Sequence, residues 1–350
     1  MYLPGGTFSE TYAEDMAIIR TKPQWVALIV LFSLLGVFPW FCSPYLLSVI
    51  SVIAITIISV QGLNILTGYC GQISLGHAAF MGIGAYISAI LATRCGISFW
   101  ISLPCAGVGS ALIGLIFGLP SLRIKGLYLA LATLAAHYII MYIISHASGL
   151  TGGTAGIEAP RPVFFGIKLA SSRSYYYLII ILTILMTFFA KNLARTRVGR
   201  NFVAIRDNDI PAEMMGISLF RYKLLAFAIG CFYAGIAGSL WAHYMTVIDP
   251  DHFHLVNAIW YVGMLIVGGM GTAVGVFFGV IFLKGVEVAA VEIGPRLADM
   301  FPSLGSSIAA SLAQFLLALI IIFFLVYEPR GLAYRWGVLK AAFRIWPFPY

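Results

Sequence analysis

The chain is a succession of apolar runs, most of them long enough to cross a lipid bilayer, separated by short polar segments. A membrane-spanning helix needs about 20 predominantly apolar residues, so the chain has room for about eight to ten crossings. Apolar residues form 61% of the sequence and charged residues 10%, whereas soluble domains hold about 45–50% and about 25%. A water-soluble fold would expose this apolar surplus and aggregate. We therefore expect an all-α fold, a polytopic transmembrane helical bundle with glycine-broken or re-entrant segments.

Hydropathy divides the chain into a polar N-terminal segment (1–24), a transmembrane domain (25–327) and a basic, aromatic tail (328–350). The first segment carries charges of both signs, and no short apolar region with a small-residue cleavage site follows it. We therefore predict a retained first span rather than a secretory signal. The expected spans are 25–41, 45–66, 75–93, 97–120, 126–145, 175–190 and 222–244, then a glycine-broken stretch over 257–290, and a last span over 308–326.

Most basic residues lie in three short clusters between or after the apolar runs. Arg123 and Lys125 follow the fourth span, the loop 191–223 holds seven more, and the tail after Tyr327 holds four. Cytoplasmic loops of membrane proteins carry such an excess of Lys and Arg. We predict that all three clusters and both termini are cytoplasmic. The net charge of +8 then reflects orientation in a membrane, and we expect no nucleic-acid partner.

The stretch 257–290 conflicts with this orientation if it crosses the membrane once, because the basic tail would then lie outside. The conflict disappears if the stretch enters from outside, breaks at residues 268–272 (GGMGT) and returns to the same side. Such a break at bilayer depth must be buried in protein or line a wet cavity. Two full crossings, one of them short, satisfy the orientation equally well. The glycines expected to break the helix here are Gly268, Gly269 and Gly271.

A second glycine-rich break lies over 66–77, where Gly71 and Gly76 flank polar residues in an apolar neighbourhood. Polar groups at bilayer depth are costly unless paired, so they mark either a transport pathway or hydrogen bonds between helices. Both interpretations stay open for each side chain, and we expect the segment as a whole to be functional. The two breaks are also compatible with an internal repeat around a central site. The candidate pathway residues are Gln72, Ser74 and His77.

The loop 191–223 is expected to form two short helices. Its first part has an amphipathic pattern with a basic face. Asp209 is then placed to cap a second helix with Pro211 in its first turn, and Gly216 to close it. Apolar residues beside charge suit docking to a soluble partner. The alternative is that the loop only holds the topology through its charge.

Four motifs, in order along the chain, resemble the branched-chain amino acid permease family of ABC importers, and in particular its larger, LivM-like permease subunit. They are residues 71–86 (GQISLGHAAFMGIGAY), 150–157 (LTGGTAGI), 199–217 (GRNFVAIRDN followed by AEMMGI) and 268–272 (GGMGT). The resemblance covers roughly residues 45–330. It implies a non-enzymatic subunit of the bacterial inner membrane. A small polar solute such as a branched-chain or other amino acid would cross through it while separate subunits hydrolyse ATP.

The resemblance also implies a set of partners: ABC ATPase subunits, a second related permease subunit and an extracytoplasmic solute-binding protein, in addition to membrane lipid. No Gly-x-x-x-x-Gly-Lys-Ser/Thr phosphate loop occurs in the chain, so ATP hydrolysis needs another subunit. By the same resemblance, the residues that would couple the chain to the ATPase are Arg200, Asp207, Glu213, Met214 and Gly216.

The sequence departs from the family in the fifth span, where His137 and Tyr138 stand near a position that is often acidic in relatives. This departure leaves the solute open, since related permeases also carry urea and short amides. The alternative function is an ion-coupled secondary transporter or channel that works without an ATPase. Such a protein is expected to carry membrane-embedded carboxylates, and we assign Glu287 to an outer segment. We expect no cofactor and no metal site, because the cluster Asp251–His254 has no further ligands nearby.

Overall fold

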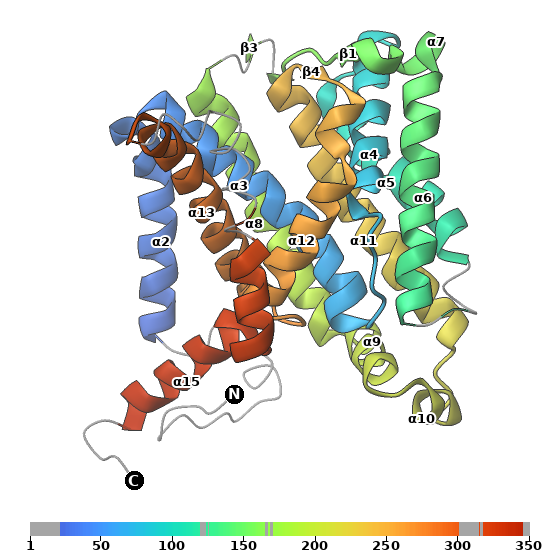
Figure 1. The fold of residues 1–350 in the computed structure, drawn as a ribbon, viewed down its shortest axis with the longest axis vertical. Helices are drawn as coiled ribbons and strands as arrows, with labels where there is room; N and C mark the ends of the chain where they lie inside the picture. Colours follow the sequence, from blue (N-terminus) through green and yellow to red (C-terminus); the bar gives the residue numbers. More distant parts are fainter. Residues whose placement is uncertain are drawn as a thin grey trace.

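The computed structural model describes residues 22–119, 126–164, 171–300 and 318–345, together with positions 124, 167, 168 and 315. These residues form a bundle of long helices with two very small sheets (Figure 1). The first part of the bundle consists of α2 (Lys22–Phe41), α3 (Pro44–Leu63), a π-helix η1 (Asn64–Tyr69), α4 (His77–Thr93), α5 (Phe99–Gly118), α6 (Leu127–His146), α7 (Ser148–Thr151), a 3-10 turn η3 (Gly153–Ala155) and α8 (Ser172–Arg195).

The second part begins with two short helices and ends in the tail. Its helices are α9 (Arg197–Asp207), α10 (Asp209–Met214), α11 (Leu219–Met245), a 3-10 turn η4 (Pro250–Phe253), α12 (Leu255–Gly268), α13 (Ala273–Met300), a helix over Ala318–Tyr327 and α15 (Gly331–Ile345). Strand β1 (Ile157–Glu158) pairs antiparallel with β4 (Val247–Ile248), and β2 (Val163–Phe164) pairs antiparallel with β3 (Ile167–Lys168).

The helices run between two ends of the molecule. One end, which we call the α10 end, carries α9, α10 and α15, and the opposite end, which we call the α7 end, carries α7, β1 and β4 (Figure 1). Six helices are long and apolar enough to cross a membrane, and shorter apolar helices cover Trp25–Phe41, His77–Thr93 and Ala318–Tyr327. Because long apolar helices run between these two ends, the α10 and α7 ends are the two faces that lie in water.

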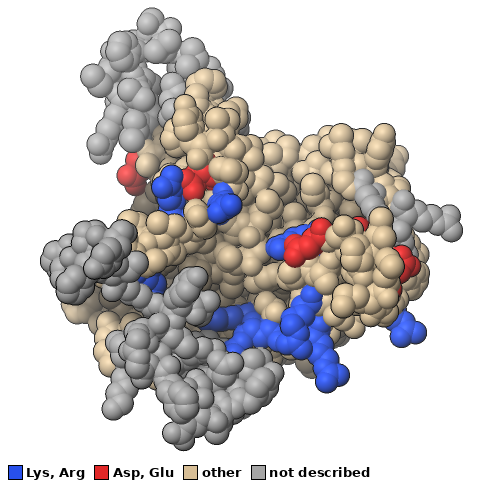
Figure 2. All heavy atoms as spheres, turned by 90° about the horizontal axis from the view of Figure 1, so that it is seen from below, with Lys and Arg blue, Asp and Glu red and all other residues tan. Residues whose placement is uncertain are grey.

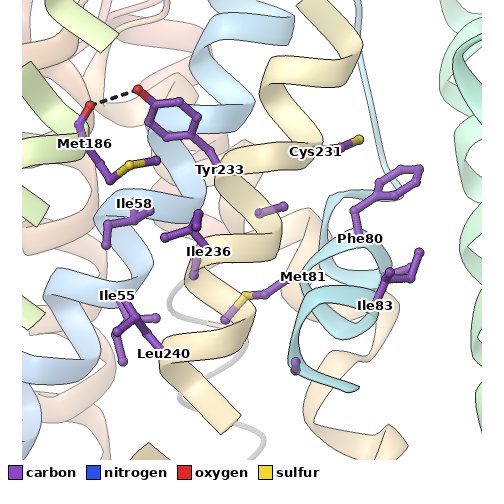
Figure 3. Close-up of a cluster of buried hydrophobic side chains, with 14 of the residues drawn as sticks. Ile55, Ile58, Phe80, Met81, Ile83, Met186, Cys231, Tyr233, Ile236 and Leu240 are labelled. Atoms are coloured by element: carbon purple, nitrogen blue, oxygen red, sulfur yellow. Dashed lines mark hydrogen bonds between the residues drawn. The ribbon is translucent and has the colours of Figure 1, made fainter. Parts of the chain in front are cut away.

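Helix α11 occupies the centre and packs against α3, α4 and α5. Glycines allow this close approach: a Cβ on Gly84 of α4 would lie 2.7 Å from the carbonyl carbon of Gly235 of α11. In a membrane, where lipid is as apolar as the helices, such backbone contact supplies much of the packing energy. Ile55, Met81 and Leu240 fill the space between the same helices, and the Tyr233 hydroxyl donates a hydrogen bond to the Met186 carbonyl (Figure 3).

The expected fold class is confirmed, since the described residues form a polytopic helical bundle. Each span expected between residues 25 and 244 coincides with a helix, although α4 begins only at His77. Residues 1–21 of the first segment, and residues 308–314, 316 and 317 of the last expected span, lie outside the described residues.

The glycine break at 268–272 does not follow the first expectation, a stretch that enters from outside, breaks and returns to the same side. It lies at the α10 end, beside Gly68 and Arg206, rather than at bilayer depth between two arms that enter from outside. Helix α12 therefore descends from the α7 end, and α13 returns to it, as in the alternative of two crossings. Helix α12 has 14 residues and rises only about 21 Å, which is why its hydropathy alone does not resemble a full span.

Candidate translocation and coupling site

Helix α3 continues at its C-terminal end as the π-helix η1. Asn64, the first residue of η1, reaches the turn between α12 and α13 with its side chain. The Gly271 amide donates to Asn64 Oδ1 at 2.9 Å, and Asn64 Nδ2 donates to the Thr272 carbonyl at 3.3 Å. One turn earlier, Gln61 Nε2 donates to the Ala273 carbonyl at 3.2 Å. A π-helix turns its side chains away from the regular α-helical spacing and is often found at functional sites. The end of α3 and the start of η1 thus present two buried amide side chains, Gln61 and Asn64, to a distant turn.

The two glycine breaks of the sequence meet at this point. A Cβ on Gly68 would lie 2.6 Å from the Gly271 backbone nitrogen, closer than any real Cβ approaches. The turn after α12 also requires glycine for its conformation, because φ is +109° at Gly269 and +78° at Gly271. The two breaks therefore touch through their backbones, which leaves no room for a side chain at position 68, while the positive φ favours glycine at position 271.

After η1 the chain does not continue as a helix but runs extended back into the bundle. Gly71 turns it with φ of +73°, and Thr67 Oγ1 donates to the Gln72 carbonyl at 2.9 Å. Leu75 N donates to Thr133 Oγ1 of α6 at 2.9 Å, and Gly76 packs against the Thr133 carbonyl. Neighbouring helices thus satisfy the backbone groups that the missing helix leaves free, as irregular backbone within a membrane requires.

The three candidate pathway residues lie on this extended segment and at the start of α4, and all three are buried. Gln72 Nε2 donates to the Lys223 carbonyl of α11 at 3.1 Å. His77 Nε2 is 2.8 Å from the Ser59 carbonyl of α3. Each of the three also keeps one buried polar atom without a partner among the described residues, namely Gln72 Oε1, Ser74 Oγ and His77 Nδ1. Gln72 and His77 therefore contribute to helix contacts, and all three residues retain unused hydrogen-bonding capacity.

Arg206, at the end of α9, was missed by the sequence analysis as a site residue. Its Nη1 donates to the Gly68 carbonyl at 3.0 Å, and its Nε and Nη2 donate to Asp207 Oδ1 at 3.0 and 2.8 Å. Its side chain also lies against Gly71 and Gly271. One guanidinium thus connects the loop between α8 and α11 to both glycine breaks. The sequence identified Arg206 only as one basic loop residue among several.

The loop between α8 and α11 forms the two expected short helices, α9 and α10, which project from the bundle at the α10 end (Figure 1). The cap of α10 corrects the expectation: Asn208 rather than Asp209 accepts the hydrogen bond from the Ile210 amide, at 3.2 Å. Asp209 instead forms an ion pair with Lys223 of α11 at 3.0 Å. This pair ties the loop to the central helix.

The tip of the loop carries exposed apolar side chains. Met214 and Met215 are each 84% exposed, and Ile210 is 68% exposed. Gly216 closes α10 with φ of +84°, as expected. Methionines are adaptable, polarisable side chains that recur at protein-binding surfaces. Lysines and arginines gather on this end of the molecule, with some acidic side chains among them (Figure 2).

The remaining candidate coupling residues are spread along the loop. Arg200 Nη1 donates to the Arg195 carbonyl at 3.3 Å, within the loop itself. Asp207 pairs with Arg206, and Glu213 lies on the exposed side of α10, next to Met214. Of the candidate residues, therefore, only Asp207 touches the side chain that joins the loop to the glycine breaks.

A cavity of about 620 Å³ opens beside this junction. It is bounded by the end of η1, the turn between α12 and α13, Arg206, and the first residues of the tail. The tail is held there by backbone contact, because a Cβ on Gly331 would lie 2.6 Å from the Gly269 Cα. Gln72, Ser74 and His77 do not line this cavity.

The α7 end contains the glycine motif of residues 150–157. Gly152 and Gly156 have φ of +77° and +79°, and β1 that follows pairs with β4. His254 lies 3.5 Å from Asp251 in η4. Within the described residues, no group of three or more His, Cys, Asp or Glu side chains is placed to hold a metal ion.

Two further positions differ from what the sequence indicates. Tyr138, one of the two residues at which the fifth span departs from the family pattern, is 59% exposed on α6, whereas its neighbour His137 is buried. Glu287, expected in an outer segment, lies within the candidate span Ala273–Glu292 and forms an ion pair with Lys284 at 2.7 Å.

Comparison with known proteins decides the family. The family described as the permease component of the branched-chain amino acid transport system matches residues 45–325. The chain belongs to this family. It is 31% identical over 295 residues to the high-affinity branched-chain amino acid transport system permease protein LivM of Escherichia coli (strain K12), which covers 77% of this chain and 69% of LivM.

A more distant relative is named for a different solute. Over 202 residues the chain is 27% identical to the autoinducer 2 import system permease protein LsrC of Salmonella paratyphi B (strain ATCC BAA-1250 / SPB7), which covers 54% of this chain and 56% of LsrC. No solved structure matches the chain. Family membership and the apolar helices together make the chain a multi-pass inner-membrane permease subunit of an ABC transport system.

Proposed function

We propose that this permease subunit imports a small polar solute, with branched-chain amino acids as the first candidates, while separate ABC ATPase subunits bind α10. The observation that supports coupling is the exposed apolar tip of the loop, where two methionines are each 84% exposed. Full burial of one such side chain stabilises a complex by about 1.5–3 kcal/mol. The α10 end is then cytoplasmic, in agreement with its many basic residues, and both termini lie on that side.

The coupling path runs through Arg206. A movement of α9 that keeps the hydrogen bond from Arg206 to the Gly68 carbonyl displaces the end of η1, and with it the extended segment that follows. Gln72, Ser74 and His77 lie on that segment or directly after it. Their unpartnered buried atoms are groups that water or a polar solute can satisfy when the helices separate. We assign these three residues to the pathway on that ground.

The other partners follow from the class of transporter. A second, related permease subunit would cover part of the apolar, lipid-facing surface of this chain and complete the pathway. An extracytoplasmic solute-binding protein would deliver solute to the α7 end. Relatives named for branched-chain amino acids and for autoinducer 2 support a small polar solute in general. Uptake of radiolabelled leucine into vesicles that contain the purified complex and ATP tests the amino-acid assignment, and uptake of other solutes alone would refute it.

An ion-coupled transporter is the second candidate, because Glu287 and Lys284 lie within a candidate span. The ion pair between them neutralises both charges, so the carboxylate is already occupied. The importer therefore remains the better supported function, and the two candidates differ in one measurable property, the need for ATP.

Purification of the tagged full chain in mild detergent, with every co-purifying protein identified by mass spectrometry, tests the coupling surface. We expect an ABC ATPase to be recovered, and the double variant Met214→Ser/Met215→Ser to lower its recovery at least tenfold. Met270→Ser is the matched control, since Met270 is an exposed methionine at the same end but on the turn after α12. A chain that purifies alone and moves solute into vesicles without ATP would overturn the importer assignment in favour of the second candidate.

A further inference from the structure

The cavity at the α10 end lies at the level where membrane spans end. One candidate span, Pro44–Tyr69, finishes beside it, and another, Ala273–Glu292, begins beside it. Thr67 and Thr272, which line the cavity, stand at those two boundaries. The ends of transmembrane helices lie in the headgroup region of the bilayer. The cavity is therefore placed where lipid headgroups are found.

The charged side chains that line the cavity are both arginines, Arg206 from α9 and Arg330 from the start of the tail. Three of the five N–H groups of Arg206 are bonded to Asp207 and to the Gly68 carbonyl, which leaves two for a ligand. The Arg330 guanidinium lies 4.9 Å from the centre of the Tyr334 ring and forms no ion pair among the described residues. Its charge is thus available to an anion.

Apolar and aromatic side chains complete the lining. Ile73 and Met270, which line it, are 40% and 50% exposed, and Tyr334 of α15 lines it as well. Farther along α15, Trp336 packs edge-on against Phe278 of α13 with 5.9 Å between ring centres. Tryptophan and tyrosine concentrate at membrane interfaces because their rings are amphipathic. The cavity combines positive charge with an apolar rim, which matches a phosphate group attached to acyl chains better than a free ion in water.

We propose that this cavity binds the phosphodiester headgroup of an anionic phospholipid from the cytoplasmic leaflet. The bound phosphate pairs with Arg206 and Arg330 together, so that the lipid joins the loop that carries α10 to the tail. Basic pockets between transmembrane helices on the cytoplasmic side bind such headgroups in other membrane proteins. The chemistry recognised is a phosphate anion, and the lipid supplies it. The consequence is that the position of Arg206, and hence of η1, depends on the lipid composition of the membrane.

Native mass spectrometry of the full chain in detergent, titrated with phosphatidylglycerol or with neutral phosphatidylcholine, tests this proposal. Each arginine near an anionic lipid contributes about 1 kcal/mol, equivalent to about fivefold in affinity. We expect Arg330→Gln to bind phosphatidylglycerol about fivefold more weakly than the wild type and to bind phosphatidylcholine unchanged. Arg330→Lys, which keeps the charge, is expected to retain most of the affinity.

Arg335→Gln is the matched control, because Arg335 lies on the same helix but pairs with Glu328 and does not line the cavity. Equal loss in Arg335→Gln and Arg330→Gln would overturn the proposal, since it would show only a general attraction of the tail to negative charge. Unchanged binding in Arg330→Gln would overturn it as well. Displacement of phosphatidylglycerol by inorganic phosphate at matched ionic strength would assign the cavity to a soluble anion and refute the lipid as its occupant.

Discussion

The contact between Asn64 and the turn after α12 makes a quantitative prediction about local stability. Asn64 is fully buried, and its side chain bonds the Gly271 amide and the Thr272 carbonyl. In Asn64→Ala both backbone groups lose their partner. A buried polar group left without a partner costs about 1–3 kcal/mol. Gly271 is half-buried and Thr272 is exposed, so water compensates in part, and we use the lower limit, about 1 kcal/mol, for each group.

The sum, about 2 kcal/mol, corresponds to a factor of about 30 in the equilibrium between the closed and the opened turn. Hydrogen exchange of the solubilised full chain, followed by mass spectrometry on peptides that contain residues 268–275, measures this opening directly. We expect amides of this segment to exchange about 30-fold faster in Asn64→Ala than in the wild type, since the exchange rate follows the population of the opened state.

Thr56→Val is the matched control for this experiment. Thr56 lies on α3, which leads into η1, is buried, and bonds the Val52 carbonyl of its own helix. Exchange over 268–275 is expected to stay unchanged in this variant. Equal exchange in Asn64→Ala and the wild type would show that the glycine contact alone holds the turn against η1, and it would refute a stabilising role for the Asn64 side chain.

Three further perturbations test other contacts. Gly84→Leu forces α4 away from α11 and is expected to abolish the monodisperse gel-filtration peak, whereas Gly36→Leu, with open space around it, should leave the peak intact. Lys223→Met removes the cationic half of the ion pair with Asp209 and is expected to lower the Tm by several degrees; the double variant with Asp209→Leu should recover most of the loss, because both charges are then removed. In Gly216→Ala the added Cβ meets no atoms, but alanine is strained at the φ of +84° that this position has. The strain costs about 1 kcal/mol, so ATPase recovery should fall only severalfold.

Hydropathy is enough to locate most of the bundle, because a helix in lipid must be both long and apolar. It is insufficient where a helix is short. Helix α12, with 14 residues, lacks the length that marks a span, so the sequence left two arrangements of 257–290 open. The contact between Gly68 and Gly271 distinguishes them. Neither glycine indicates by itself which distant backbone it approaches.

The candidate site shows a similar division. Local signals correctly predicted the two short helices and the positive φ of Gly216. They did not identify the cap of α10, since Asn208 and Asp209 are adjacent and chemically equivalent as caps. Tertiary structure decides between them, because Lys223 of α11 forms an ion pair with Asp209. Arg206 was missed for the same reason: its role depends on the Gly68 carbonyl, 138 positions away in the chain.

The junction at the α10 end is built almost without flexible side chains, and this has a mechanical consequence. Gly68 meets Gly271, and Gly269 meets Gly331, through backbone atoms. Long side chains can change rotamer and absorb a displacement, but backbone in van der Waals contact cannot move independently of its neighbour. Arg206 joins α9 to this junction through a hydrogen bond to a backbone carbonyl. A displacement of α9 that keeps this hydrogen bond would therefore move η1, the turn after α12 and the start of the tail together. A change of the Arg206 rotamer would break the connection, so we expect Arg206 to be the one adjustable element between α9 and the extended segment that carries Gln72.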